Sequence, residues 1–392
     1  MIKQRKINKT TPIKEEVEDI VKPLSNRRWY VRILLRLTLV WVSLILLFEF
    51  IYPKYTISKC HWSNWETREK PYRITLFADP QIIDKYTYPK RFKIIKYFTT
   101  RISDQYHYNN YRIVNSILQS DANIFLGDLF DGGRYWDDEY WLEEYQRFNK
   151  IFPAYDKVEI RSIPGNHDIG FQNISIEVVD RFAKYFGQAN LDFVLGNHTI
   201  ILFDSISLSH ENTTVNKAAN DYLDKFDNYS RPRILLSHVP LYRHPDKQLC
   251  GPKREKSGLF PLQRGDQYQT VIEYHHAQRM LNKFKPSLIL AGDDHDYCDI
   301  IQKYTDGSAR EIAVKSCAMT SGIKYPAIQM LSLFNDGTDE NTFETEMCYL
   351  PKPLVNFYAY VLFYLGSLIY LKRLVLVWSI LIPLVILHYL YI

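Results

Sequence analysis

The 392-residue sequence is poor in the residues that mark fibrous, low-complexity and zinc-finger proteins. Its 15 glycines and 18 prolines are too few for a collagen-like or low-complexity chain. The five cysteines form no CxxC pair, so the ligand spacing of a zinc finger is missing. No internal repeat is present. Apolar residues nevertheless make up 46% of the chain, which is enough for a sizeable core and excludes a wholly disordered protein.

The central part of the chain also lacks an excess of positive charge. Residues 1–36 contain ten Lys/Arg and four Asp/Glu, whereas residues 53–353 contain 37 Lys/Arg and 39 Asp/Glu. The formal charge of +5 therefore comes from the N-terminal arm. A nucleic-acid-binding body would carry its own basic surface, so we expect no nucleic-acid partner.

Long apolar runs lie at both ends of the sequence. Residues 33–52, 354–371 and 374–392 are each long enough for a membrane helix of roughly 20 residues. Lys/Arg residues favour the cytosolic side. We therefore expect residues 1–32 to form a cytosolic basic arm, and residues 53–353 to form a lumenal domain of a multi-pass membrane protein.

All five cysteines lie within the expected lumenal domain. In an oxidising lumen they allow two disulfides and leave one thiol. The sequence does not determine the pairing, although a bridge between Cys60 and Cys348 would join the two ends of the domain. The sequons at Asn173, Asn197 and Asn212 agree with a lumenal location.

Within this domain, short apolar segments alternate with segments of helical periodicity, which predicts an α/β or α+β fold. A polar segment at residues 247–263 is a candidate substrate-covering loop. The helices are expected at residues 91–118, 138–152 and 267–284. The strands are expected at residues 73–78, 122–126, 158–163, 191–204 as a hairpin, 233–237, 287–291, 310–316 and 328–334.

Polar side chains follow five of these strands directly. Ligand-binding groups in open α/β sheets gather at the carboxyl ends of strands, so we expect the five segments to meet. The segments are Asp79-Pro-Gln81, Gly127-Asp128-Leu-Phe-Asp131-Gly-Gly-Arg134, Gly165-Asn166-His167-Asp168, Ser237-His238 and Gly292-Asp293-Asp294-His295.

The residue types in these segments are ligands for divalent cations. Two neighbouring cations need a shared carboxylate and several further donors to offset their charge. Asp128 suits the shared position because Gly127 lets the backbone approach closely. Two ions held in this way can activate a hydroxide that bridges them and bind both oxygens in a phosphoryl displacement.

The order of these five segments resembles that of the calcineurin-like metallophosphoesterases, over about residues 72–335. The resemblance implies a four-layer β-sandwich flanked by helices, with a dinuclear metal site on the loops at the edge of the sheets. By position, it implies one metal held by Asp79, Gln81, Asp128 and His295, and a second held by Asp128, Asn166, His238 and Asp293.

The same resemblance implies roles for four further residues. His167 would contact the phosphate and protonate the leaving alkoxide, and Asp168 would orient its imidazole ring. Asp131 would contact the metal ligands without binding a metal itself, and Arg134 would contact the phosphate.

Two ligand positions depart from the commonest pattern of this family. Gln81 and Asp293 stand where histidines are usual. Replacing two imidazoles by an amide and a carboxylate makes the site richer in hard oxygen donors, which favour Mn²⁺ or Mg²⁺ over zinc. We therefore expect two divalent ions and predict a preference for Mn²⁺.

A narrower resemblance is to the fungal membrane-anchored branch of the family, carried by residues 79–81, 127–134 and 292–298. It implies removal of ethanolamine phosphate from a mannose of GPI anchors, in the endoplasmic reticulum or early Golgi membrane. A GPI glycan at the lumenal membrane surface is thus the expected partner. Two alternatives remain open: a lumenal phosphoesterase acting on another phosphodiester or phosphomonoester, and a non-catalytic membrane scaffold.

Overall fold

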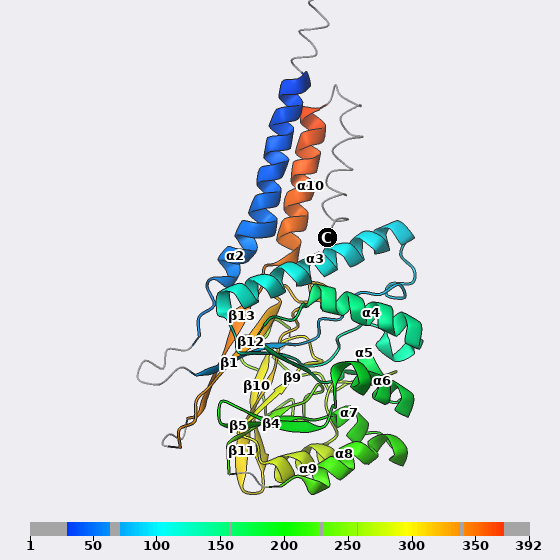
Figure 1. Ribbon diagram of the computed structural model, residues 1–392, viewed down its shortest axis with the longest axis vertical. Helices are drawn as coiled ribbons and strands as arrows, with labels where there is room; N and C mark the ends of the chain where they lie inside the picture. Colours follow the sequence, from blue (N-terminus) through cyan, green and yellow to red (C-terminus); the bar gives the residue numbers. More distant parts are fainter. Residues whose placement is uncertain are drawn as a thin grey trace, which may run out of the picture.

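The computed structural model describes residues 30–62, 71–156, 158–227, 230–256, 258–337 and 341–371. Two sheets with helices packed around them form the body of the molecule, and two long apolar helices project together from one end (Figure 1). The mixed α/β class predicted from the alternating pattern is confirmed.

The first sheet has five strands in the order β13-β12-β1-β2-β3. β1, β2 and β3 run parallel, β12 pairs antiparallel with β1, and β13 pairs antiparallel with β12. The carboxyl ends of the three parallel strands therefore meet at one edge. The strands are β1 (Tyr72–Phe77), β2 (Ala122–Phe125), β3 (Glu159–Ser162), β12 (Ala327–Leu333) and β13 (Phe343–Tyr349).

The second sheet has six strands in the order β10-β11-β9-β6-β5-β4. Its inner strands β11, β9, β6 and β5 are parallel, and an antiparallel strand closes each side. The strands are β4 (Leu191–Leu195), β5 (His198–Leu202), β6 (Arg233–Leu236), β9 (Leu288–Ala291), β10 (Cys298–Tyr304) and β11 (Gly307–Ala313); β7 (Arg264–Gly265) and β8 (Tyr268–Gln269) form a separate small hairpin.

Alternation along the strands divides the core into two apolar clusters. Ile74 and Leu76 of β1 share one cluster with Ile234 and Leu236 of β6, so this cluster draws on both sheets. Phe77, beside them in sequence, belongs to the other cluster, which includes side chains of the surrounding helices. The helices are α3 (Lys93–Leu118), α4 (Asp138–Ile151), α5 (Asn166–Ile169), α6 (Ile176–Phe186), α7 (Ser205–Leu208), α8 (Thr213–Lys225), α9 (Tyr274–Phe284) and the short η2 (Gly133–Tyr135).

The two projecting helices are Tyr30–Ile57, which includes η1 (Leu46–Ile51) and α2 (Tyr52–Ile57), and α10 (Pro353–Tyr370). Both are long and apolar enough to cross a membrane. The indole Nε1 of Trp41 donates to Ser367 Oγ at 3.2 Å, and the Tyr360 hydroxyl donates to Glu49 Oε1 at 2.8 Å. The first helix extends beyond the predicted 33–52 segment. The expected helix at 374–392, and the arm up to residue 29, lie outside the described residues.

Two disulfides and one free thiol are present among the described residues, as the cysteine count predicts. Cys60 pairs with Cys348 across 288 residues, at the points where the two apolar helices join the body. Cys250 pairs with Cys298, and Cys317 is free and buried. The first bridge ties the ends of the domain together.

Replacing Cys60 and Cys348 together by Ser is expected to lower the free energy of unfolding by about 2–5 kcal/mol. The bridge closes a loop of 288 residues, so its loss raises the conformational entropy of the unfolded chain. Denaturant unfolding of the full chain measures the change. Reconstitution into a bilayer should reduce the loss relative to detergent, because a bilayer around both apolar helices would hold them together; a larger loss in the bilayer would contradict this explanation.

One predicted helix begins later than expected, and the structure adds two strands and the helices α6 and α8, which were not predicted. The helix expected at 267–284 begins only at Tyr274, because the small β7–β8 hairpin occupies residues up to Gln269. Strands β10 and β13 were not expected at all. Both are edge strands with one partly exposed face, so they lack the continuous apolar run that indicates a buried strand.

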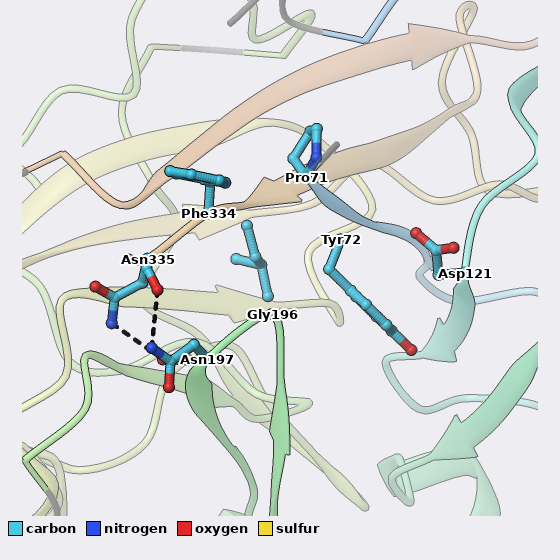
Figure 2. A pocket seen from close by; sticks show the side chains of 8 residues that line it. Pro71, Tyr72, Asp121, Gly196, Asn197, Phe334 and Asn335 are labelled. Carbon is cyan, nitrogen blue, oxygen red and sulfur yellow. Dashed lines mark hydrogen bonds between the residues drawn. The ribbon is translucent and has the colours of Figure 1, made fainter. Parts of the chain in front are cut away.

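The predicted hairpin turn is present between β4 and β5, with Gly196 and Asn197 both at positive φ. This turn lines a surface pocket of about 330 Å³ together with Tyr72 and Asn335 (Figure 2). The pocket lies where β1 begins. The polar segments follow the opposite ends of the strands, so this pocket is separate from the candidate site.

Candidate metal centre

The polar segments converge at the carboxyl edge of the two sheets. β1, β2 and β3 lead to Asp79, Asp128 and Asn166, while β6 and β9 lead to His238 and Asp293. Ligand atoms of Asp79, Asp128 and His238 all lie within 4.8 Å of one another, and all three residues are buried. Two sheets thus supply one cluster of donors.

Asp128 lies at the centre of this cluster. Its Oδ1 accepts the backbone N–H of His167 at 2.9 Å, and its Oδ2 accepts Nε2 of Gln81 at 2.9 Å. Nε2 of His238 is 3.3 Å from Oδ1. Burial opposes ionisation, but the charges and hydrogen bonds of His238 and His167 outweigh it and hold the pKa of Asp128 well below its ordinary value.

His238 and Asn166 each direct one donor atom toward the cluster. Nδ1 of His238 is 2.7 Å from the carbonyl of Leu126, which leaves Nε2 facing Asp128 and, at 3.7 Å, Asp293 Oδ1. The amide Nδ2 of Asn166 donates to the carbonyl of Gln267 at 2.9 Å, so its Oδ1 lies 3.3 Å from His238 Nε2. Backbone contacts of this kind fix metal ligands in orientation.

Asp79 and Asp293 each direct a buried carboxylate toward the cluster. Within the described residues, Oδ2 of each lacks any hydrogen bond. Burial, only partly offset by His238, raises the pKa of Asp293 to about 8 and that of Asp79 well above its ordinary value. Buried oxygens that repel one another and lack donors are costly unless a cation joins them, so the donor set fits divalent metal binding.

The backbone at these ligands is strained. Asp79, Gln81, Asp128, Asp293 and His295 all have positive φ, between 36° and 66°. In the described part of the chain, these five make up half of the ten non-glycine residues with positive φ. Such conformations cost of order 1–3 kcal/mol each and concentrate at functional sites. Strain at five of the seven expected ligands therefore supports a function that requires this geometry.

Two glycines make room for the cluster. Gly127 has a φ of 87°, and a Cβ there would collide with the imidazole of His238. A Cβ on Gly165 would collide with the carboxylate and backbone N–H of Asp128. The expectation that a glycine permits close approach at Asp128 is confirmed, and Gly165 permits a second one.

Gln81 and His295 border the same cluster. The backbone N–H of Gln81 donates to the carbonyl of Asp128 at 2.8 Å, which places this side chain beside the central carboxylate. Nδ1 of His295 lies 3.3 Å from the carbonyl of Ser321. Burial lowers the pKa of His295 to about 4, with Asp128 acting in the opposite direction. A neutral imidazole is the form that binds metals.

His167 lies at the mouth of the cluster, with about a quarter of its side chain exposed. Its Nδ1 is 2.5 Å from the backbone carbonyl of Asp131 and 3.5 Å from Oδ1 of Asp131. The hydroxyl of Thr87 donates to Oδ2 of the same carboxylate at 2.6 Å. Since Nδ1 is engaged, Nε2 is the nitrogen available to a substrate.

The role expected for Asp168 needs correction. Its carboxylate accepts backbone N–H groups of Leu129, Phe130 and Gly165 at 2.8–3.1 Å, and does not orient His167. Asp131 holds that imidazole instead. Burial raises the pKa of Asp168 to about 7, and the charge of Asp128 adds to this. Asp168 therefore joins the loops that carry Asp128 and Asn166.

Arg134 reaches the cluster from the short helix η2. Its NH1 donates to the carbonyl of Asn166 at 3.2 Å, and its guanidinium lies 4.7 Å from the ring centre of Tyr135. Within the described residues its Nε is buried without a partner. The guanidinium is thus positioned next to the donors, where an anion could bind.

A segment that we call the disulfide strap, residues 250–256, supports the last ligand loop. The Cys250–Cys298 bridge attaches one end of the strap. Arg254 forms a buried double hydrogen bond with Asp294, the residue between Asp293 and His295. Backbone N–H groups of Glu255 and Lys256 donate to Asp296 at 2.8 Å. The expected covering loop at 247–263 thus includes a fixed strap.

Two residues near the centre were not expected from the sequence. The Nζ of Lys256 donates to the carbonyl of Asp294 at 3.0 Å, and its charge affects Asp293 and His295. Burial, followed by repulsion from Asp293, Asp294 and Asp128, raises the pKa of Tyr268. Both lie far from the ligand motifs in sequence, and no local pattern distinguishes them.

Replacing Arg254 by Met is expected to destabilise the fold by about 3–5 kcal/mol, because it leaves Asp294 buried without its charge partner. It should also weaken metal binding by about 10–100-fold through the adjacent ligands. Unfolding curves and metal titrations measure both effects. In the Asp294→Asn background the same change should cost much less. Equal costs in both backgrounds would show that the pair does not hold the loop.

Known proteins are similar to this chain in sequence. Residues 72–297 match the family model described as calcineurin-like phosphoesterase. Cell division control protein 1 of Saccharomyces cerevisiae is 45% identical over 365 residues, which cover 88% of this chain and 74% of that protein. Metallophosphoesterase 1 of Rattus norvegicus is 26% identical over 352 residues, covering 81% and 84%.

A dimetal phosphatase structure from Danio rerio aligns with 72% of this chain and all of its own, at 12% identity and a TM-score of 0.39. So weak a similarity adds nothing to the family assignment, which rests on the sequence matches. The family model matches more than half of the chain, and the Saccharomyces cerevisiae relative is 45% identical. The chain is therefore a member of the calcineurin-like phosphoesterase family, a hydrolase acting on phosphoric ester bonds.

Proposed function

We propose that this hydrolase acts on a phosphodiester with two divalent cations bound at the carboxyl edge of the sheets. The observation that carries the proposal is the convergence of buried carboxylates, two of which have one oxygen each without a hydrogen-bond partner in the described part of the chain. When bound, the cations would activate water and offset the charge of the phosphate. The proposed ligands are Asp79, Gln81, Asp128 and His295 for one ion, and Asp128, Asn166, His238 and Asp293 for the other.

His167 is the proposed proton donor. The backbone carbonyl and carboxylate of Asp131 both face its Nδ1, which leaves Nε2 free to face a substrate. Nε2 would then donate its proton to the oxygen of the departing alcohol. Arg134 would bind a non-bridging oxygen of the phosphate, since its guanidinium is anchored on Asn166 beside the ligands.

Mn²⁺ is the ion that we propose for both positions. Among the seven side chains, five offer oxygen and only His238 and His295 offer nitrogen. Hard oxygen donors favour Mn²⁺ or Mg²⁺ over zinc. Metal analysis of the purified protein tests this choice, and zinc with the highest zinc-supported activity would exclude it.

We further propose that the fold is a four-layer sandwich anchored in a membrane. Support comes from the apolar cluster shared by both sheets, the helices around them and the two apolar helices at one end. The proposed topology is multi-pass, with the N-terminus cytosolic and residues 53–353 in the lumen of the endoplasmic reticulum or early Golgi. Two disulfides within that segment fit an oxidising compartment.

The proposed substrate is the ethanolamine phosphate on a GPI mannose. The resemblance to the fungal membrane-anchored branch motivates it, and the anchored geometry makes it physically reasonable. A GPI glycan lies at the lumenal membrane surface, so a tethered enzyme meets it at high effective concentration. The exposed ring of Tyr135, beside Arg134, could contact the ethanolamine cation.

Release of phosphoethanolamine from a GPI glycan by the detergent-solubilised full chain tests this proposal. We expect release with Mn²⁺ and none with chelator. Hydrolysis of a generic phosphodiester without any action on GPI would retain the phosphodiesterase and exclude the substrate. Failure on both would favour a non-catalytic scaffold.

A further inference from the structure

Residues 85–103, which we call the basic-aromatic segment, differ in charge from the rest of the domain. They contain six Lys/Arg residues and no Asp/Glu, although the domain as a whole is slightly acidic. Five aromatic residues lie in the same stretch. The segment covers the connection from the first ligand loop and the N-terminal part of α3. Neither the metal centre nor the core explains this composition.

The segment exposes large apolar side chains together with its cations. Phe92 is 79% exposed, Ile94 66% and Ile95 51%. Lys90, Arg91 and Lys93 are exposed beside them. Large apolar side chains are normally buried, and the exposed positions of a helix are normally polar. Aromatic and basic residues in one exposed stretch are typical of the water–membrane boundary.

The segment also lies at the end of the molecule from which the apolar helices project. The Tyr106 hydroxyl of α3 donates to the carbonyl of Pro351, just before α10, at 2.7 Å. Tyr111 of α3 belongs to the same apolar cluster as Ile57, the last residue of α2. Figure 1 shows α3 lying across the base of both projecting helices. A bilayer around those helices would therefore approach α3.

We propose that residues 85–103 dock on the headgroup layer of this bilayer, with Phe92 and Ile94 inserted and the cations on anionic lipid phosphates. The proposal rests on the membrane anchoring proposed above. Charge complementarity favours a lipid surface, because the segment contains six cations and no acidic residue; Asp104, whose charge interacts with Arg101, lies just beyond it.

Docking would also position the metal centre. The segment begins directly after Asp84, and Thr87 donates to Asp131, which holds His167. The Lys96 ammonium closes this loop on the carbonyl of Lys85 at 2.7 Å. A segment resting on the headgroups would thus hold the mouth of the centre at a fixed height, within reach of a membrane-linked substrate.

Spin labelling of the full chain in nanodiscs that contain anionic lipid tests the proposal. A nitroxide attached to Ile94→Cys should collide with oxygen more often, and with a water-soluble nickel complex less often, than one at Ile301→Cys. Ile301 is a matched exposed isoleucine on β10. Leu39→Cys, in the first apolar helix, reports on the anchor itself. Cys317 is buried and should stay unlabelled.

Each lysine near an anionic surface raises the ratio of docked to undocked segment roughly fivefold. Replacing both Lys90 and Lys93 by Glu should therefore lower this ratio by at least about 30-fold. The helix should persist, since Glu is favourable at a helix start. The matched change at Lys225 and Lys303, exposed elsewhere, should have no effect. Hydrolysis of a soluble ester should stay unchanged in both variants.

The outcomes separate this proposal from the one on which it rests. A water-exposed label at Ile94 with a lipid-exposed label at Leu39 would overturn docking alone. Water exposure at both positions would overturn the anchor as well. Spin–spin broadening at Ile94 without lipid contact would assign the segment to a second copy of the chain and overturn the lipid proposal.

Discussion

Asp128→Asn is expected to lower kcat/KM for a phosphodiester by at least about 10³-fold while leaving the fold intact. The carboxylate lies at the centre of the cluster, close to His238 and Gln81. An amide has the same size and still accepts the His167 N–H at Oδ1, but it has no charge to share between two cations. Metal content should fall along with activity.

Asp137→Asn is the matched control for this change. Asp137 caps α4 by accepting the N–H of Tyr140 at 2.8 Å, and Asn is an equally good cap. Activity and metal content should therefore match the unmodified protein. Near-normal turnover by the Asp128 variant would show that this carboxylate is not shared between metals, and the proposed mechanism would then fail.

His167→Gln is expected to lower turnover by about 10²–10⁴-fold on a substrate with an alkyl leaving group, with metal content unchanged. Its imidazole is held by Asp131 at the mouth of the cluster and is not among the proposed ligands. The loss should be much smaller on an aryl ester, whose leaving oxygen needs no proton. Kinetics with a series of leaving groups measure this difference.

The contrast between leaving groups distinguishes proton donation from binding. If His167 only bound the phosphate, the losses would be equal across the series. Metal loss in the variant would instead assign His167 to the ligands. Either result would contradict the role proposed here.

The ligand cluster could be predicted because each segment directly follows an apolar strand. The pattern of apolar segments predicted β1, β2, β3, β6 and β9, and parallel strands place their carboxyl ends together. The convergence of the five segments can therefore be predicted without knowing any contact between residues far apart in the sequence. The hydrogen bonds and burial around Asp128 agree with that expectation, while the metal-binding roles await the tests above.

The surroundings of the cluster could not be predicted in this way. Arg254 pairs with Asp294 across 40 residues, and Asn166 is oriented by Gln267 across 101. These contacts depend on how loops cross the sheet edge, for which the sequence has no periodic signal. The same holds for Asp168, whose partners are backbone groups of Leu129 and Phe130.

The most direct test of a dinuclear centre is electron paramagnetic resonance of the metal-free full chain titrated with Mn²⁺. Two ions per chain should bind, and the second should produce the signal of an exchange-coupled pair, which Asp128→Asn should abolish. A fully active protein that holds a single ion, or two ions without coupling, would contradict the proposal that Asp128 joins two metals.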